Sequence, residues 1–463
     1  MTSPTFGSRR FEFPRCITWG LVFILLAAPA SGCARYQPKF GGDTPYLQRM
    51  KTQTRDSVTI SVAGLSAAES RKIFGVDLAK HNILPVWLKI ENHDPQSSYF
   101  FLQRGLDPNY FSAGEAAYIA RIRPGIRLFD RPLLRILMPL GFFLAPVDYF
   151  FVQPANDRMR EAFTREAIKY GWFAPGEAKA GFVFVPFEMG TKQVTVDLIE
   201  HNPQKGSEVL KRFDFFVEIP GINADYRNKA FDDLYKPEEI RHIAGEAEFQ
   251  KALEELPCCV TDFRGKKKGD PLNLVVIATL PEILEAFTTA EWDETETISF
   301  RSILRMIRSF SLKKAYNYSP ISPLYLYGRS QDIALQKTRG NIHERMHLRL
   351  WLSPMTFDGK PVWIGQASRD IGIRFTARTW NLMTHKIDPD VDESALYVLS
   401  DLVYRRRVGK YGVVGGGIPR TPENPGRNLT GDPYYTSGKR MVMELPAKQA
   451  PEVPARFFVP GEQ

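Results

Sequence analysis

The sequence predicts an α+β protein of several domains, in which strands outnumber helices and most strand pairs are antiparallel. At 463 residues the chain is longer than one ordinary hydrophobic core. Apolar and polar residues alternate in many short runs, which is the period of a half-buried strand. Turn residues separate these runs by short connections, which favours antiparallel pairing of consecutive strands.

The N-terminus carries the pattern of a bacterial export signal. Basic residues up to Arg15 precede an apolar run at 17–28, and the sequence ASGC then ends at Cys33. Small residues before a cysteine are typical of a lipobox. We therefore expect a signal peptide over 1–32 and a lipid-modified Cys33, whose acyl chains anchor the protein in one leaflet. The alternative is an ordinary cleaved signal with a coincidental cysteine.

The polar segment 33–52 contains several prolines and glycines and is predicted to be a flexible tether between the lipid and the first domain. Ala34 is not the aspartate that would favour retention in the inner membrane. The expected location is therefore the bacterial cell envelope, with the outer membrane favoured and the protein facing the periplasm. The membrane is then a partner through the N-terminal lipid.

Residues 53–222 are predicted to form a β-sandwich, plausible as an immunoglobulin-like one. Its strands are runs with an apolar residue at every second position. These runs lie at 58–62, 86–90, 99–102, 182–185, 194–198 and 213–219. A Cys-Trp-Cys signature is missing from the sequence, so the strand topology stays open.

An apolar helical insertion, at about 113–175, interrupts the sandwich. Its segment 133–152 has the length of a transmembrane helix. However, it contains Arg135 and Asp148, and each buried charge costs about 2.5–3.5 kcal/mol on insertion scales. We therefore expect an apolar helical hairpin that contacts the membrane or a partner, or else a buried core helix. The residues expected at this contact are Leu137, Phe142 and Phe143.

Residues 223–417 are predicted to form a second, α+β domain with a mainly antiparallel sheet. Strands are expected at 274–278, 324–327, 333–335, 348–352 and 361–367. Helices are expected at 237–256, 281–288 and 298–310, and a last helix, capped by Asp390 or Asp392, is expected to run through Arg407. Asp358-Gly359 readily supplies the positive φ that a tight hairpin needs. The Pro-rich tail 418–463 is predicted to be disordered.

Four motifs of the second domain resemble the LssY C-terminal domain family. They are DPLNLVV at 270–276, SPLYLYGRSQDIALQK at 322–337, HLRLW at 347–351 and HKIDPDVD at 385–392. The resemblance covers about residues 256–417. It implies a bacterial envelope protein with a domain that is sometimes fused to membrane-embedded lipid-phosphatase-like modules, and that has no accepted catalytic activity of its own.

Histidines and aspartates in this domain suggest a metal site, because imidazole and carboxylate together suit zinc, manganese or iron. The candidate ligands are His385, Asp388, Asp390 and Asp392, with His343 and His347 from the preceding strand region. The alternative is structural, since aspartates just before a helix also cap it and meet its positive end.

A second candidate site is cationic. Guanidinium and ammonium groups on successive strands could converge on a phosphate or carboxylate. The candidate residues are Arg329, Lys337, Arg349 and Arg369. The ligands to test are phospholipid headgroups. The alternative is that these cations form ion pairs, for example with Asp332, Asp358 and Asp370.

Several classes of function are excluded by the sequence. It has no Walker A loop, no GxGxxG after a strand, no GxSxG elbow and no HExxH. The net charge of +9 is spread over the whole chain, so nucleic acid is not an expected partner. Cys258 and Cys259 are adjacent, and two buried thiols are expected rather than a strained vicinal disulfide.

Two functional hypotheses follow. The first is a cell-envelope lipoprotein with a binding or structural role at the membrane, whose partners are anionic lipid headgroups or another envelope protein. The alternative is a metal-dependent hydrolase that acts on a phosphorylated or lipid substrate. A divalent metal is the only cofactor that the pattern suggests.

Overall fold

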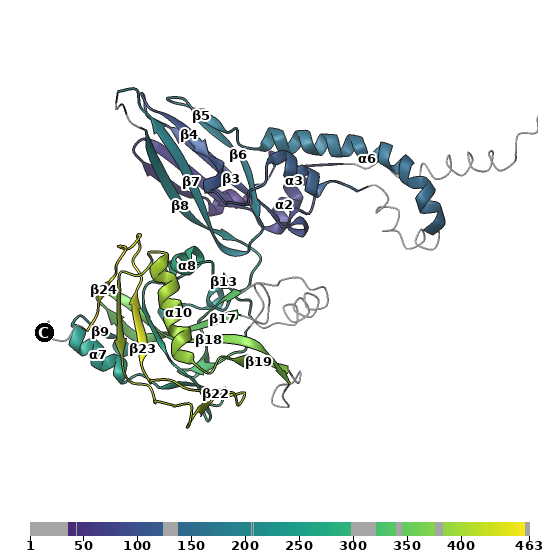
Figure 1. Cartoon of the computed structure of the whole chain (residues 1–463). Coiled ribbons are helices and arrows are strands. Elements are labelled where there is room, and N and C mark those ends of the chain that lie inside the picture. The colour runs from purple at the N-terminus through teal and green to yellow at the C-terminus, as the bar shows by residue number, and fades with distance from the viewer. Residues whose placement is uncertain are drawn as a thin grey trace, which may run out of the picture. The chain divides into compact units, whose positions relative to one another are not determined.

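The computed structural model describes residues 36–42, 44–123, 138–204, 206, 208–297, 321–338, 345–375 and 383–458 (Figure 1). The chain divides into two compact units. The first comprises the chain up to Glu188 together with Val194–Asp214, and the second comprises Met189–Gln193 and everything from Phe215. The chain thus passes between the units more than once, where the sequence predicted a single boundary near 222.

Two four-stranded sheets form the framework of the first unit. One has the order β1-β2-β3-β6 and the other β5-β4-β7-β8. Their strands are β1 (Lys51–Arg55), β2 (Val58–Gly64), β3 (Ile83–Asn92), β4 (Ser98–Leu102), β5 (Gly171–Phe173), β6 (Ala178–Pro186), β7 (Gly190–His201) and β8 (Val209–Ile219). All six predicted strands of this unit are present.

Side-chain hydrogen bonds link the two sheets. Gln53 Nε2 on β1 donates to Asp214 O on β8 at 2.6 Å, and Asn92 Nδ2 at the end of β3 donates to Ala174 O beyond β5 at 2.9 Å. The immunoglobulin-like topology is not confirmed. In that fold the second strand pairs with the first and the fifth, whereas here β2 pairs with β1 and β3.

Among the described residues, three α-helices pack against one face of the first sheet. They are α2 (Ala67–Phe74), α3 (Ala113–Ala120) and α6 (Met138–Glu166). Their apolar side chains form one cluster with strand residues, and at its centre Phe163 of α6 stacks on Phe184 of β6 at 5.2 Å between ring centroids. Phe74 of α2 packs against Phe163 at 4.9 Å.

The predicted apolar hairpin is not confirmed, because the described part of segment 133–152 belongs to one helix, α6, that runs from Met138 to Glu166 without a turn. Pro139 lies in the first helical turn, where proline is tolerated. Pro146 and Pro154 lie inside the helix, where proline kinks but need not end it, and Figure 1 shows that α6 is bent. No helix among the described residues is long and apolar enough to span a membrane.

The predicted flexible tether is also corrected from Tyr36 onward. Tyr36 and Tyr46 are buried, and Lys39 N donates to Ile73 O of α2 at 2.8 Å. A 3-10 helix, η1, covers Pro45–Arg49. The prolines and glycines of this segment therefore shape a strap that packs on the domain, since buried aromatic rings outweigh its polar composition.

One ten-stranded sheet dominates the second unit. Its main order is β13-β16-β17-β18-β12-β23-β20-β24, with β19 on β18 and β9 on β17. The strands are β9 (Arg241–Ile243), β12 (Leu274–Ile277), β13 (Asp293–Glu294), β16 (Ile333–Thr338), β17 (Arg345–Phe357), β18 (Lys360–Phe375), β19 (Met383–Ile387), β20 (Lys410–Val414), β23 (Arg440–Glu444) and β24 (Ala455–Arg456). The predicted antiparallel meander is confirmed in β16, β17 and β18, and the predicted turn has positive φ at Asp358 and Gly359.

Smaller sheets and three α-helices complete the described part of this unit. The smaller strands are β10 (Cys259–Thr261), β11 (Lys268–Pro271), β14 (Tyr325–Leu326), β15 (Arg329–Ser330), β21 (Gly426–Arg427) and β22 (Pro433–Tyr434). The helices are α7 (Glu246–Glu254), α8 (Leu280–Thr289) and α10 (Val391–Tyr404). The predicted helix 298–310 lies outside the described residues, and the predicted helix 237–256 is reduced to α7 after a short 3-10 turn at Pro237–Glu239.

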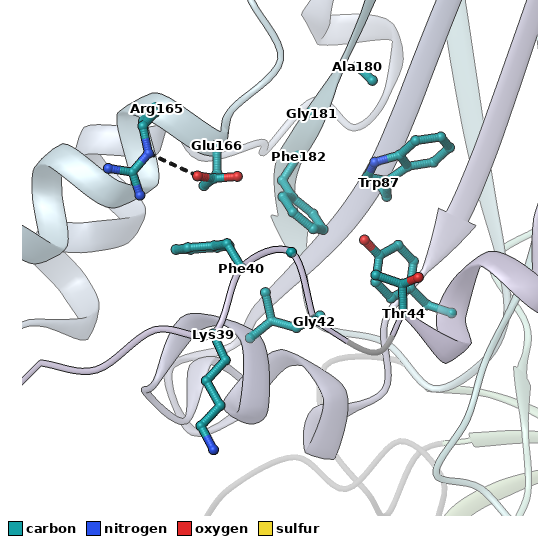
Figure 2. Close-up of a pocket in the computed structure, with 13 residues that line it drawn as sticks. Lys39, Phe40, Gly42, Thr44, Trp87, Arg165, Glu166, Ala180, Gly181 and Phe182 are labelled. Carbon is teal, nitrogen blue, oxygen red and sulfur yellow. Dashed lines mark hydrogen bonds and ion pairs between the residues drawn. The ribbon is translucent and has the colours of Figure 1, made fainter.

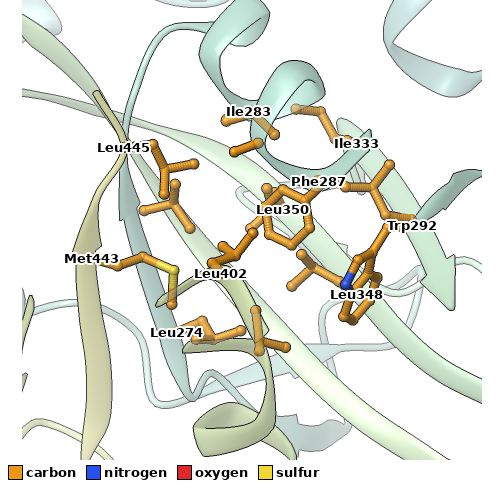
Figure 3. Close-up of a cluster of buried hydrophobic side chains, with 14 of the residues drawn as sticks. Leu274, Ile283, Phe287, Trp292, Ile333, Leu348, Leu350, Leu402, Met443 and Leu445 are labelled. Atoms are coloured by element: carbon orange, nitrogen blue, oxygen red, sulfur yellow. The ribbon is translucent and has the colours of Figure 1, made fainter. Parts of the chain in front are cut away.

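Helices α8 and α10 cover one face of the large sheet. Figure 3 shows Phe287 of α8 and Leu402 of α10 directed at sheet residues that include Leu348 and Leu350. Trp363 of β18 belongs to the same cluster, and its Nε1 donates to Ala278 O at 2.8 Å. This apolar layer is the main core of the second unit.

The predicted disordered tail is wrong over its described part. Strand β23 lies inside the large sheet, parallel to β12 and antiparallel to β20. Arg440 at its start is fully buried and donates to five backbone carbonyl oxygens, among them Leu272 O at 3.1 Å and Pro257 O at 2.8 Å. The tail is ordered because Val442 and Met443 are buried in the sheet, and the prolines lie outside the strand.

Candidate functional site

The aspartates of the predicted metal site cap a helix and brace nearby turns. Asp390 is the N-cap of α10, and its side chain accepts a hydrogen bond from Glu393 N at 3.1 Å. Asp388 accepts from Asp390 N at 3.1 Å, and Asp392 accepts from Thr436 Oγ1 at 2.5 Å. Among the described residues, no three histidine, cysteine or acidic side chains are grouped as metal ligands would be.

The three candidate histidines occupy different places. His385 is on β19 opposite Ile373, but its side chain lies outside the described residues, as does all of His343. His347 is on β17 and is buried against Asp370 of β18, so its nearest acidic partner is not one of the predicted aspartates.

The four predicted anion-binding cations do not meet. Three of them form ion pairs: Arg329 with Asp332 at 2.9 Å, Lys337 with Asp401 at 2.8 Å and Arg369 with Glu393 at 3.0 Å. Asp401 and Glu393 belong to α10, so Lys337 and Arg369 lie on the helix-covered face of the large sheet. Because side chains alternate along a strand, Arg349 lies on the opposite face.

That opposite face carries an uncommon set of buried polar side chains, which we call the polar sheet face. It consists of Gln336 on β16, Arg345, His347 and Arg349 on β17, and Gln366, Ser368 and Asp370 on β18. The strand register places His347 beside Gln336 and Ser368, and Arg349 beside Gln366. Every one of these seven side chains is less than 9% exposed, although polar residues are mostly found at the surface.

Apolar residues continue the same face further along the strands. Trp351 follows Arg349 at the next position of this face, and Ile364 precedes Gln366. Both belong to a cluster with Leu324 and with Leu326 of β14. The face therefore changes from apolar to polar at a defined place, between Trp351 and Arg349.

His347, Asp370 and Arg345 form the charged end of the polar sheet face. His347 Nε2 lies 2.6 Å from Asp370 Oδ2, and Arg345 Nη2 lies 3.6 Å from the same oxygen. Burial lowers the pKa of His347 to about 4, an effect that the Asp370 charge opposes and Arg345 supports. At neutral pH the imidazole is therefore uncharged, and because a carboxylate only accepts hydrogen bonds, its proton is on Nε2.

Arg349 is the other charged member, and it is bound by neutral groups. Its Nε and Nη2 donate to Ser322 O at 3.3 and 3.1 Å, and its Nη1 donates to Gln366 Oε1 at 2.8 Å. None of the ion pairs among the described residues includes it. Burial lowers its pKa to about 10, against the longer-range attraction of Asp270 and Asp370.

Sequence reasoning singled out His347 and Arg349 but assigned them to two different sites, and it missed Arg345. The available signal was the spacing Arg345, His347, Arg349, which puts three basic residues on one side of a strand. Basic residues at this spacing are ordinarily expected on a solvent-exposed face of a strand. Only the register with β16 and β18 shows that this face is buried.

The described part of the first unit contains a pocket of about 240 Å³ beside the strap (Figure 2). Aromatic rings of Phe40, Trp87 and Phe182 line it together with Lys39 and the neighbouring Arg165 and Glu166. Arg165 Nε lies 3.0 Å from Glu166 Oε1, so this cation is already neutralised. None of the residues predicted to form a site is in this pocket.

The adjacent cysteines are unbridged. Cys259 is buried, and burial together with the neighbouring thiol raises its pKa to about 12. A thiol with so high a pKa is protonated at neutral pH and is a poor nucleophile. The predicted lipid site, Cys33, lies outside the described residues, as does Leu137, and of Phe142 and Phe143 only the helical backbone is described.

The second unit is thus an α+β domain with one large mixed sheet, helices on one face and a buried polar patch on the other. Residues 252–439 match the protein-family model described as LssY C-terminus, which confirms the resemblance drawn from the four motifs. The match includes β16, β17 and β18 and therefore all of the polar sheet face. Neither the curated proteins nor the solved structures include a match to the chain.

Proposed function

We propose that this protein is a lipid-anchored component of the bacterial cell envelope, with outer-membrane sorting favoured, and that it acts by binding at the membrane surface. The observation that carries the proposal is the position of Tyr36. Tyr36 is buried in the first unit, and only Ala34 and Arg35 separate it from Cys33. Three residues of extended chain reach about 10 Å.

This short link supports a surface-bound first unit. A lipid on Cys33 is buried in one leaflet, so the strap that begins at Tyr36 cannot leave the headgroup region. The strap is fixed to α2 through Lys39 N and Ile73 O. The first unit is then held at the bilayer and cannot sample the width of the periplasm.

The apolar part of α6 supports the same arrangement. The sequence from Met138 to Val152 is mostly apolar and includes Phe142 and Phe143. Figure 1 shows this half of α6 extending past the sheets of its unit. An apolar helix on a lipid-anchored domain is suited to lie in the membrane interface.

The binding function is preferred to the metal-dependent hydrolase because the described aspartates of the proposed metal site already hold a helix N-terminus and two turns. Their hydrogen-bond geometry explains their positions without a metal. The buried polar sheet face gives the second unit a place for an anionic group.

Membrane fractionation tests the anchoring. The full chain, expressed in a bacterium with two membranes and fed labelled palmitate, is expected to carry the label and to sediment with the outer membrane. Cys33→Ser should lose the label and appear largely in the soluble fraction. Equal membrane association of an unlabelled parent and of Cys33→Ser would refute the proposal.

A linker insertion tests the short link. Twenty Gly/Ser residues inserted between Arg35 and Tyr36 should keep the palmitate label but reduce crosslinking of the first unit to lipid headgroups. The matched control carries the same linker at Gly265, an exposed turn in the second unit. Unchanged crosslinking in the Arg35–Tyr36 insertion would show that something other than the link holds the unit at the membrane.

A further inference from the structure

The buried positive charge of Arg349 has no ion-pair partner among the described residues. It is 8% exposed and its three described hydrogen bonds go to a backbone carbonyl and an amide oxygen. A guanidinium has five N–H donors, so two of them have no acceptor among the described residues. Asp270 and Asp370 attract this guanidinium only at longer range, so a direct ion pair does not repay its desolvation.

His347 adds an unused acceptor on the same face. Its Nε2 side is occupied by Asp370, whereas its Nδ1 is buried and has no hydrogen-bond partner. With the proton on Nε2, Nδ1 carries a lone pair. A ligand that met both Nδ1 and Arg349 would have to present a donor to the first and a negative oxygen to the second.

We propose that the polar sheet face is a binding site for a phosphate group that keeps one ionisable P–OH, as in inorganic phosphate or a phosphate monoester. Its P–OH donates to His347 Nδ1, and its charged oxygens accept from Arg349 and from the nearby Arg345. Gln336, Gln366 and Ser368 supply neutral polar groups around it. No covalent step is involved. This site does not depend on the anchoring at Cys33.

The lone pair on Nδ1 also sets the selectivity. Sulfate resembles phosphate in shape and charge but has no proton at neutral pH, so its oxygen would face the Nδ1 lone pair. A buried acceptor opposite an acceptor loses the hydrogen bond and leaves both groups desolvated. The site should therefore prefer phosphate over sulfate, and a phosphate monoester over a phosphate diester.

Equilibrium dialysis of the full chain in detergent with labelled inorganic phosphate tests the site, with sulfate as the competitor. We expect saturable binding of about one phosphate per chain and at least 10-fold weaker competition by sulfate, which is about 1.4 kcal/mol of discrimination. Failure to bind phosphate at millimolar concentration, or equal competition by sulfate, would overturn the proposal. This comparison needs no variant, so it does not depend on the folding of a mutant.

Two variants separate the roles. His347→Gln keeps an amide donor for Asp370 and removes the Nδ1 acceptor, so phosphate and sulfate should then compete equally. Arg349→Gln should weaken both anions at least 10-fold. The matched control is Arg369→Gln, which removes the same charge from the same sheet on the face covered by α10. Loss of binding in Arg369→Gln equal to that in Arg349→Gln would refute the assignment to the polar sheet face.

Vesicles distinguish the source of the phosphate group. Phosphatidic acid carries a monoester headgroup and phosphatidylglycerol a diester, and both make the membrane anionic. Displacement of labelled phosphate by phosphatidic acid but not by phosphatidylglycerol would assign the site to a lipid headgroup. Displacement by a soluble sugar phosphate and by neither lipid would assign it to a soluble monoester. Displacement by both lipids to the same extent would contradict the requirement for a P–OH.

Discussion

His347 Nε2 and Asp370 Oδ2 lie 2.6 Å apart on neighbouring strands of the large sheet, and both side chains are nearly inaccessible to solvent. The imidazole of His347 stays uncharged at neutral pH because burial lowers its pKa by more than the Asp370 carboxylate raises it. This balance has consequences for stability that can be measured without knowing the ligand.

The second unit should lose stability in mild acid because of His347. Its pKa is about 4 in the folded protein and about 6.5 when unfolded, so between these values the unfolded chain binds the extra proton. Stability therefore falls as pH falls from 6.5 towards 4, by up to about 3 kcal/mol from this group. Urea unfolding at pH 7 and pH 4.5 should show a smaller difference in His347→Gln than in the parent. An equal difference would show that His347 is not buried in neutral form.

Phe287→Ala should strongly destabilise the second unit. Phe287 is fully buried between α8 and the sheet and packs edge-on against Trp292 at 5.4 Å between ring centroids. Removing a buried aromatic ring typically costs about 3–5 kcal/mol. The control is Leu396→Ala on α10, which is 49% exposed and should change the unfolding free energy by less than about 0.5 kcal/mol. Similar losses in the two variants would contradict the core assignment.

Asp390 should behave as a helix cap and not as a metal ligand. Asp390→Ala is expected to cost about 0.5–2 kcal/mol, because Glu393 N loses its acceptor. Asp390→Asn retains an acceptor oxygen and should keep most of the stability. The opposing hypothesis, a metal site, is tested by elemental analysis of the parent, His385→Ala and Asp390→Asn, all purified without chelator. About one metal per parent chain, lost in both variants, would support the hydrolase.

Truncation after Gly417 should prevent the second unit from folding. It removes β23 and with it Arg440, Val442 and Met443, which are buried in the sheet. The control truncation, after Phe458, removes only the last five residues and should leave the unfolding transition in place. Limited proteolysis of both truncated proteins measures whether the second unit has folded. A protease-resistant second unit in the shorter product would show that β23 is dispensable.

Sequence reasoning succeeded where one physical pattern dominates. The alternation of Leu348, Leu350 and Leu352 with polar or aromatic residues predicts a strand, and Asp358-Gly359 predicts the hairpin that follows it. Both are present because each strand has one face in the apolar core, which fixes its register.

The prediction failed where the deciding contacts are remote in sequence. β23 is a five-residue strand among prolines and glycines, and its partners β12 and β20 lie elsewhere in the chain. The strap at Tyr36 looks flexible by composition and is fixed by Ile73. The polar sheet face was split between two predicted sites because a basic residue at every second position suggests exposure, and only strand pairing shows otherwise.

The position of β23 also constrains the order in which the protein can be made. β23 is the strand between β12 and β20, so the sheet has a vacant place until the ribosome has made Arg440–Glu444, long after β12. The second unit therefore folds late, and until β23 is made β12 and β20 each lack a neighbour on one edge. For a chain proposed to be exported, this delay is useful, because a polypeptide that cannot finish its sheet stays extended enough to be threaded across the inner membrane.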